Sequence, residues 1–264
     1  MNQQNVKRLR KILDKALEDF IEQNEVLADA LGPAFAFKRW HDQELAAFIC
    51  SILAYGKVSQ INRNIRKILD PMGASPHEWL MNAKLKDLKK ISKNWYHRFN
   101  NEKDILTMLQ VLQKIYSEYG SIEKFIGADE SFGAYEVIEK FAAGIDKILL
   151  DLPAPDKSFW FFIPRPSDGS ACKRMNLFLR WMVGRSATDF NLWSTIHTRN
   201  LVIPLDVHIF RQAHSLKLTR RKQANWETAV EITNSLKHLD PLDPTKYDFA
   251  LCHLGMRGNV LSQL

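Results

Sequence analysis

A lysine and an aspartate, separated by 33 residues, have surroundings in this sequence that favour chemistry. Lys173 follows the small residues 169–172 and stands in the first turn of a predicted helix. Free backbone N–H groups at a helix start attract anions such as phosphate, and the same positive end lowers the cost of removing a proton from a nearby lysine. A neutral lysine is a nucleophile toward a sugar aldehyde or a glycosidic carbon. The simpler alternative is a solvated lysine in a first helical turn.

Asp206 stands at the start of a second predicted helix, after the apolar and proline-containing lead-in 201–205. The simplest role for an aspartate at this position is an N-cap, which stabilises a helix by about 1 kcal/mol. The alternative role is a carboxylate that the helix end holds in a cleft. The two roles are compatible, because a capping carboxylate is both oriented and kept ionised.

Helices must position both residues, because apolar side chains recur at spacings of three and four along most of the chain. We predict helices at about 171–183 and 206–216, and irregular segments at 151–170, which is rich in proline, and at 184–204. No segment keeps the two-residue period of a strand. The fold class is therefore predicted to be all-α, with ten or more helices.

Three further polar residues are expected to mark helix starts. Asp42 and Ser75 are predicted to cap helices in the first third of the chain, and Asp243 is predicted to open the last helix together with Pro244. The lysines between positions 84 and 93 are interpreted as a solvated helix face.

The composition is that of a soluble globular protein: 264 residues, 45% hydrophobic and 25% charged, with a net charge of +7. The basic excess is compatible with a nucleic-acid partner, although many basic proteins bind none. Three cysteines cannot form a four-cysteine zinc or iron–sulfur site, and they predict a reducing, cytoplasmic compartment. No apolar run reaches membrane-spanning length and the N-terminus lacks a signal core, so no membrane contact is expected. We expect neither a metal nor another cofactor.

The stretch LVIPLDVHIFRQAHSLKL, residues 201–218, resembles the segment that carries the essential aspartate in the helix-hairpin-helix base-excision DNA glycosylases. That superfamily includes endonuclease III and the 8-oxoguanine glycosylases. The resemblance aligns Gly169 and Ala171 with the two hairpin glycines and Lys173 with the catalytic lysine. Residues 48–63 are similar to the early helix pair. The whole chain also resembles an uncharacterised bacterial family placed in that superfamily.

The sequence departs from the superfamily pattern at several points. Ala171 replaces the second hairpin glycine, and Tyr55 stands where the early helix often ends in glutamine. The separation of Lys173 from Asp206 is closer to the archaeal 8-oxoguanine glycosylase type, in which an irregular insert lies between the two residues. The iron–sulfur loop of endonuclease III is absent, as the cysteine content requires.

The resemblance implies a two-lobed helical glycosylase-like fold with a degenerate helix-hairpin-helix. One lobe would be a helical bundle of residues 41–185 that ends in the hairpin-like segment. The other lobe would combine residues 1–40 with residues 200–264. Residues 186–199 would form an irregular insert.

The resemblance also implies a DNA base-excision repair glycosylase with abasic-site lyase activity. Lys173 would attack the sugar C1′ of an extruded nucleotide and form a Schiff base, and Asp206 would stabilise the cationic sugar. The partner would be double-stranded DNA with a damaged or abasic site, and the insert hints at oxidised purines. The implied location is cytoplasmic and nucleoid-associated. The residues expected to contact DNA are Gly169, Ala171, Arg174, His208, Arg211, Arg220, Arg221 and Lys222.

Two alternatives stay open. Because Ala171 replaces a hairpin glycine, the chain could be a catalytically silent relative that binds damaged or bent DNA. It could also be an unrelated helical protein that acts on RNA or binds another partner. Loss of strand cleavage on mutation of Lys173 would separate the enzyme from the silent relative, and failure to bind any duplex would favour the unrelated protein.

Overall fold

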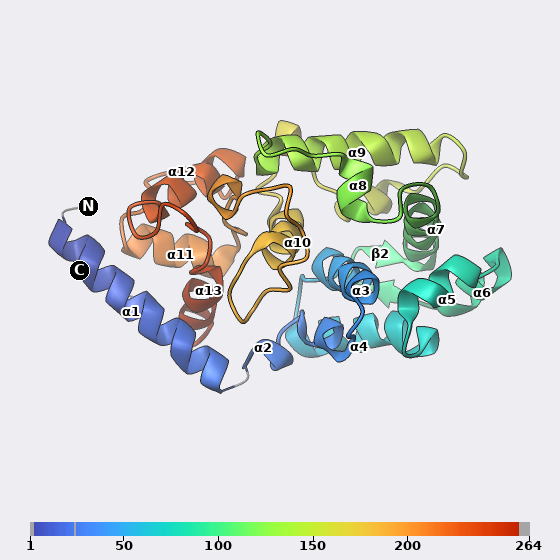
Figure 1. Ribbon diagram of the computed structural model, residues 1–264, viewed down its shortest axis with the longest axis horizontal. Coiled ribbons are helices and arrows are strands. Elements are labelled where there is room, and N and C mark those ends of the chain that lie inside the picture. Colours follow the sequence, from blue (N-terminus) through green and yellow to red (C-terminus); the bar gives the residue numbers. More distant parts are fainter. Residues whose placement is uncertain (1–2, 24, 259–264) are drawn as a thin grey trace. The chain divides into compact units, whose positions relative to one another are not determined.

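The computed structural model describes residues 3–23 and 25–258, and it is mainly helical, as the sequence predicts (Figure 1). The described α-helices are α1 (Gln3–Glu22), α2 (Glu25–Ala28), α3 (Trp40–Ile52), α4 (Val58–Leu69), α5 (Pro76–Asn82), α6 (Leu85–Ser92), α7 (Glu102–Tyr119), α8 (Ile122–Ile126), α9 (Ala134–Leu149), α10 (Lys173–Val183), α11 (Val207–Ser215), α12 (Trp226–Leu236) and α13 (Asp248–Met256). Two strands of two residues each, β1 (Tyr96–His97) and β2 (Asn100–Asn101), pair antiparallel as a short hairpin that strand periodicity could not reveal.

The described residues fall into two compact units. Unit 1 holds the chain up to residue 26, Glu130–Tyr135, and the chain from residue 165 onward, whereas unit 2 holds Leu27–Asp129 and Glu136–Pro164. These limits differ from the expected bundle lobe of residues 41–185, because residues 165–185 belong to unit 1. The reason is local hydrogen bonding: Trp226 N donates to Gly169 O at 3.3 Å, and Ser170 forms a β-bridge with Asn225. Lys173 and Asp206 therefore share unit 1.

The core of unit 1 is built from apolar side chains of α1, α11, α12 and α13. Leu13 from α1, Ile209 from α11, Ile232 from α12 and Leu251 from α13 are all buried in one cluster. Burial of each such side chain stabilises the fold by about 1.5–3 kcal/mol. The cluster thus fixes α11, which Asp206 precedes, against α13.

In unit 2 a predicted helix cap serves a different helix from the one expected. Asp42 lies in the first turn of α3, whose N-cap is Arg39, and its Oδ1 accepts the backbone N–H of His77 in α5 at 2.8 Å. Ser75 is the N-cap of α5, as predicted, but its side chain makes no capping bond. The Asp42 carboxylate from α3 therefore caps α5, a contact between segments that local sequence rules cannot anticipate.

A buried cluster of charges organises the loops of unit 1. Arg180 of α10 is 1% exposed, and it forms ion pairs with Asp189 at 2.9 Å, Asp243 at 3.6 Å and Asp248 at 3.8 Å. A side chain at Gly184 would overlap both Arg180 and Asp189, so this position must be glycine. The predicted start of the last helix at Asp243 is wrong, because α13 begins at Asp248. The cluster explains the difference: Asp243 faces Arg180 from the turn before the helix.

The cluster carries three carboxylates for one guanidinium, and this excess makes unit 1 sensitive to pH. Burial of the Asp248 carboxyl raises its pKa to about 7, against the opposing effect of Arg180. A carboxyl whose pKa is higher in the folded state binds its proton more tightly there than in the unfolded chain. The free energy of unfolding therefore falls as the pH rises from the unfolded value near 3.8 to the folded value.

We expect the substitution Asp248→Asn to remove this fall, because the amide has no proton to lose. The thermal midpoint of the wild type should decrease relative to that of D248N between about pH 4 and about pH 8, as followed by circular dichroism. Asp70→Asn, which removes one exposed carboxylate of unit 2 and leaves the Arg180 cluster intact, is the control and should keep the pH profile of the wild type. Parallel pH profiles of wild type and D248N would contradict the prediction.

Candidate functional site

The two side chains singled out from the sequence lie next to each other in unit 1. The Nζ atom of Lys173 is 3.7 Å from Oδ2 of Asp206, and their side chains are 32% and 14% exposed. Lys173 is the first residue of α10 and Asp206 immediately precedes α11. Two helix N-termini thus bring a partly accessible amine and a mostly buried carboxylate together, and such a pair can in principle supply a nucleophile and an adjacent proton acceptor.

The loop before Lys173 has two residues in the left-handed region of backbone space. Gly169 has a φ of 75°, which suits glycine, and Cys172 has a φ of 48°, which is uncommon for a residue with a side chain. Ala171, which the resemblance aligns with a glycine, is not among the residues with positive φ. Its carbonyl accepts the Nδ2 donor of Asn176 at 3.1 Å, which anchors the loop to α10. The turn into Lys173 is therefore made at Cys172.

Asp206 is the N-cap of α11, as predicted. Its Oδ1 accepts the backbone N–H groups of His208 at 2.9 Å and Ile209 at 2.8 Å. The other oxygen, Oδ2, faces Lys173 and accepts the thiol of Cys252 at 3.2 Å. One oxygen therefore holds the helix start, and the other is presented to the lysine.

Cys252 is a site residue that sequence reasoning missed. It lies on α13, 46 residues after Asp206, and it has no neighbouring motif that could have marked it. Gly255, one turn later, lets α13 approach α11 closely, since a side chain there would lie 3.0 Å from Cβ of His208. The close packing of α13 on α11 is what brings the thiol to the carboxylate.

The residues expected to contact DNA have different surroundings in the structure. Arg174 is only 7% exposed, so little of this residue can reach a phosphate. Arg211, Arg220 and Lys222 are exposed, as phosphate contacts must be. His208 is half-buried, and its Nδ1 atom is buried without a hydrogen-bond partner among the described residues.

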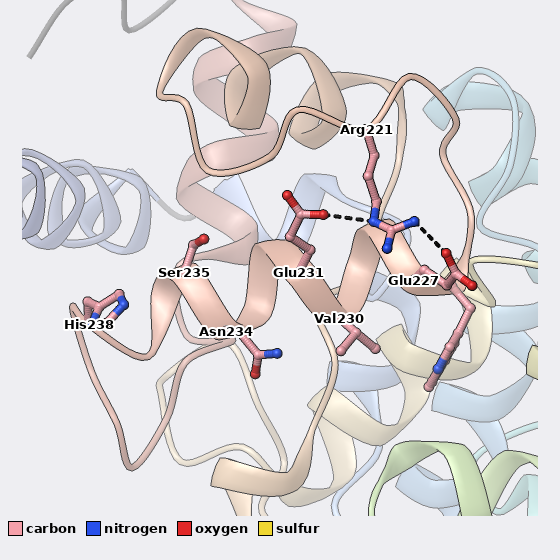
Figure 2. Close-up of a pocket in the computed structure, with 8 residues that line it drawn as sticks. Arg221, Glu227, Val230, Glu231, Asn234, Ser235 and His238 are labelled. Carbon is pink, nitrogen blue, oxygen red and sulfur yellow. Dashed lines mark hydrogen bonds and ion pairs between the residues drawn. The ribbon is translucent and has the colours of Figure 1, made fainter. Parts of the chain in front are cut away.

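Arg221 is engaged within unit 1. Its guanidinium donates to Glu231 at 2.7 Å and to Glu227, both on α12, as Figure 2 shows. These residues line a shallow hollow of about 590 Å³ that includes neither Lys173 nor Asp206. The two carboxylates offset the charge of Arg221, so its exposed neighbours Arg220 and Lys222 are better placed to meet a phosphate.

A family model described as "Protein of unknown function (DUF2400)" matches residues 29–257. The chain belongs to this family. The match spans both Lys173 and Asp206, together with Cys252, so the whole candidate site lies within the DUF2400 region. No curated protein and no solved structure matches the chain.

Two features are absent from the described residues of this DUF2400 protein. No group of three or more histidine, cysteine, aspartate or glutamate residues in that part of the chain could hold a metal ion. No helix there is both long enough and apolar enough to cross a membrane.

The two roles of Asp206 can be separated by substitution. Asparagine is as good an N-cap as aspartate, so Asp206→Asn should keep the helix start while it removes the partly exposed ion pair with Lys173, which contributes little to stability, and the weak thiol hydrogen bond from Cys252. Asp206→Ala should lower the free energy of unfolding by about 1 kcal/mol, as measured by urea titration. Asn225→Ala, which removes the N-cap of α12 in the same unit, is the matched control and should cost a similar amount. Equal stability of D206A and wild type would contradict the capping role.

Proposed function

We propose that this protein is a DNA base-excision glycosylase with abasic-site lyase activity, and that it has the two-lobed glycosylase fold. The observation that carries the proposal is the distance of 3.7 Å between Lys173 Nζ and Asp206 Oδ2. The sequence resemblance picks out these two residues from segments 33 residues apart. An unrelated helical protein would have no reason to bring them together.

The proposed reaction requires Lys173 in its neutral amine form. The lysine first loses a proton, for which Asp206 Oδ2 is the adjacent acceptor. Nζ then forms a bond to the sugar C1′ of an extruded nucleotide, and the base leaves with the electrons of the glycosidic bond and takes up a proton. The carboxylate of Asp206 stabilises the positive charge that develops on the sugar.

The lyase step follows from the covalent adduct. Opening of the sugar ring gives a Schiff base between Lys173 and C1′. Removal of a proton from C2′ then expels the 3′ phosphate and nicks the strand, and water hydrolyses the Schiff base to release the lysine. No step needs a metal, an oxidant or a nucleotide cofactor.

The exposed basic residues of unit 1 suit a DNA substrate. Arg211 on α11 and Arg220 and Lys222 in the loop before α12 are exposed and belong to the same unit as Lys173. Each can neutralise a phosphate, and the affinity for DNA should then fall steeply with salt. The specific damaged base depends on contacts to the extruded nucleotide, and an oxidised purine is our proposal from the resemblance alone.

The direct test is borohydride trapping on a duplex that carries one abasic site. Wild type should give a covalent protein–DNA adduct, because borohydride reduces the Schiff base to a stable amine. Lys173→Ala should give none, whereas Lys237→Ala, at an exposed lysine of the same unit, should react like wild type. Asp206→Asn should slow trapping by about a hundredfold or more, since it removes the proton acceptor.

The outcomes separate the proposal from its rivals. An adduct with Lys173→Ala would assign the Schiff base to a different amine. No adduct with any variant would remove lyase chemistry through Lys173, and salt-dependent duplex binding would then favour the catalytically silent DNA-binding relative. Failure to bind any duplex would exclude both the glycosylase and the silent DNA-binding relative.

A further inference from the structure

Unit 2 contains a pocket that has no part in the proposed glycosylase and lyase reaction. It has a volume of about 490 Å³, and two tryptophans, Trp79 and Trp95, form part of its wall. Trp95 is buried and its Nε1 donates to Asn64 O at 3.2 Å, so this indole is fixed in place. Trp79 is only half-buried and has ring surface to offer. The volume falls in the range of small-ligand pockets.

Three lysines stand at the same pocket. Lys67 lies on α4, Lys90 lies on α6, and Lys93 immediately follows the last residue of α6. All three lysines are exposed. None of the three makes an ion pair with a described residue. The one carboxylate in the wall, that of Asp87, already accepts the backbone N–H of Lys84. The pocket therefore carries an excess of positive charge that the protein itself does not neutralise.

The positive charge continues beyond the pocket on both helices. On α4, Arg63 lies one turn before Lys67, and on α6, Lys86 lies one turn before Lys90, which places each pair on one helix face. Both Arg63 and Lys86 are exposed, and α4 packs against α6. The lysines of residues 84–93 are thus part of a larger basic surface that includes α4, and not only the solvated face expected from the sequence.

A second hollow beside Trp79 has an acidic wall. A neighbouring hollow of about 320 Å³ is lined by Trp79 together with Glu78 and Asp87, and no cation lines it. A negatively charged group is therefore favoured in the pocket with the three lysines over this neighbouring hollow.

We propose that this pocket binds one nucleotide of a single-stranded nucleic acid. The base stacks on Trp79, and the flanking phosphates lie against Lys67, Lys90 and Lys93. A simple anion would not stack on the indoles, and an uncharged aromatic ligand would not interact electrostatically with the three lysines. A nucleotide supplies both a flat ring and a phosphate, and stacking on aromatic side chains in a basic groove is how single strands are held.

The continuation of the charge along α4 and α6 argues for a strand rather than a free nucleotide. A free nucleotide has phosphate groups at one end only, and it would leave Arg63 and Lys86 without a partner. A base within an intact duplex cannot present its face, so the strand must be unpaired at this position. The proposal does not depend on Lys173, because the pocket belongs entirely to unit 2.

The test measures binding of a fluorescently labelled, undamaged ten-residue oligothymidylate by anisotropy over a range of salt. Trp79→Ala should weaken binding by at least about fivefold, the lower end of what one stacked base contributes, whereas Trp79→Phe should retain most of the affinity. The triple variant Lys67→Gln/Lys90→Gln/Lys93→Gln should lower the slope of log affinity against log salt by about 2. Thermal unfolding of each variant shows whether it has folded.

The matched control is the triple variant Lys7→Gln/Lys11→Gln/Lys237→Gln, which removes the same charge from exposed lysines of unit 1 and should leave the slope unchanged. Unchanged binding and slope in W79A and in the pocket triple would overturn the proposal. So would absence of binding by wild type, or equal competition by thymidine monophosphate or by an acidic peptide. Since the oligonucleotide is undamaged and Lys173 is intact throughout, any of these results leaves the lyase test untouched.

Discussion

The carboxylate of Asp206 is the constraint on which the candidate site depends, because each of its oxygens has separate partners. Oδ1 accepts two backbone N–H groups at the start of α11, and these bonds fix the orientation of the whole carboxylate. Oδ2 is thereby aimed at Lys173 and at the thiol of Cys252. A helix cap, which usually serves stability alone, here sets the direction of the group that faces the lysine.

The elements that carry these partners are joined by a second contact, buried deeper in unit 1. Arg180 lies two turns after Lys173 on the same face of α10, and Asp248 lies one turn before Cys252 on α13. The ion pair between Arg180 and Asp248 therefore links the helix of the lysine to the helix of the thiol. The spacing between the amine and the carboxylate is supported from both ends, by the helix cap at Asp206 and by the buried charge cluster around Arg180.

Local rules predicted much of this arrangement, and their failures have a common cause. The start of α11 at Asp206 follows from its own side chain and the next few residues, so the sequence was sufficient there. Asp42 caps α5 instead of α3, and Cys252 reaches Asp206 from 46 residues away. Both contacts join segments that only the packed core brings together, and no spacing rule contains that information. The basic pocket of unit 2 was missed for the same reason, since its cations come from two different helices.

The left-handed conformation of Cys172 explains why a sequence motif with two glycines would not match this chain. The loop into Lys173 turns at Gly169 and at Cys172, whereas Ala171 has no need of glycine's conformational freedom. A motif search that demands glycine two positions before the lysine would reject this chain, although its backbone makes the turn one residue later. Patterns written in terms of allowed backbone angles, rather than residue letters, would retain it.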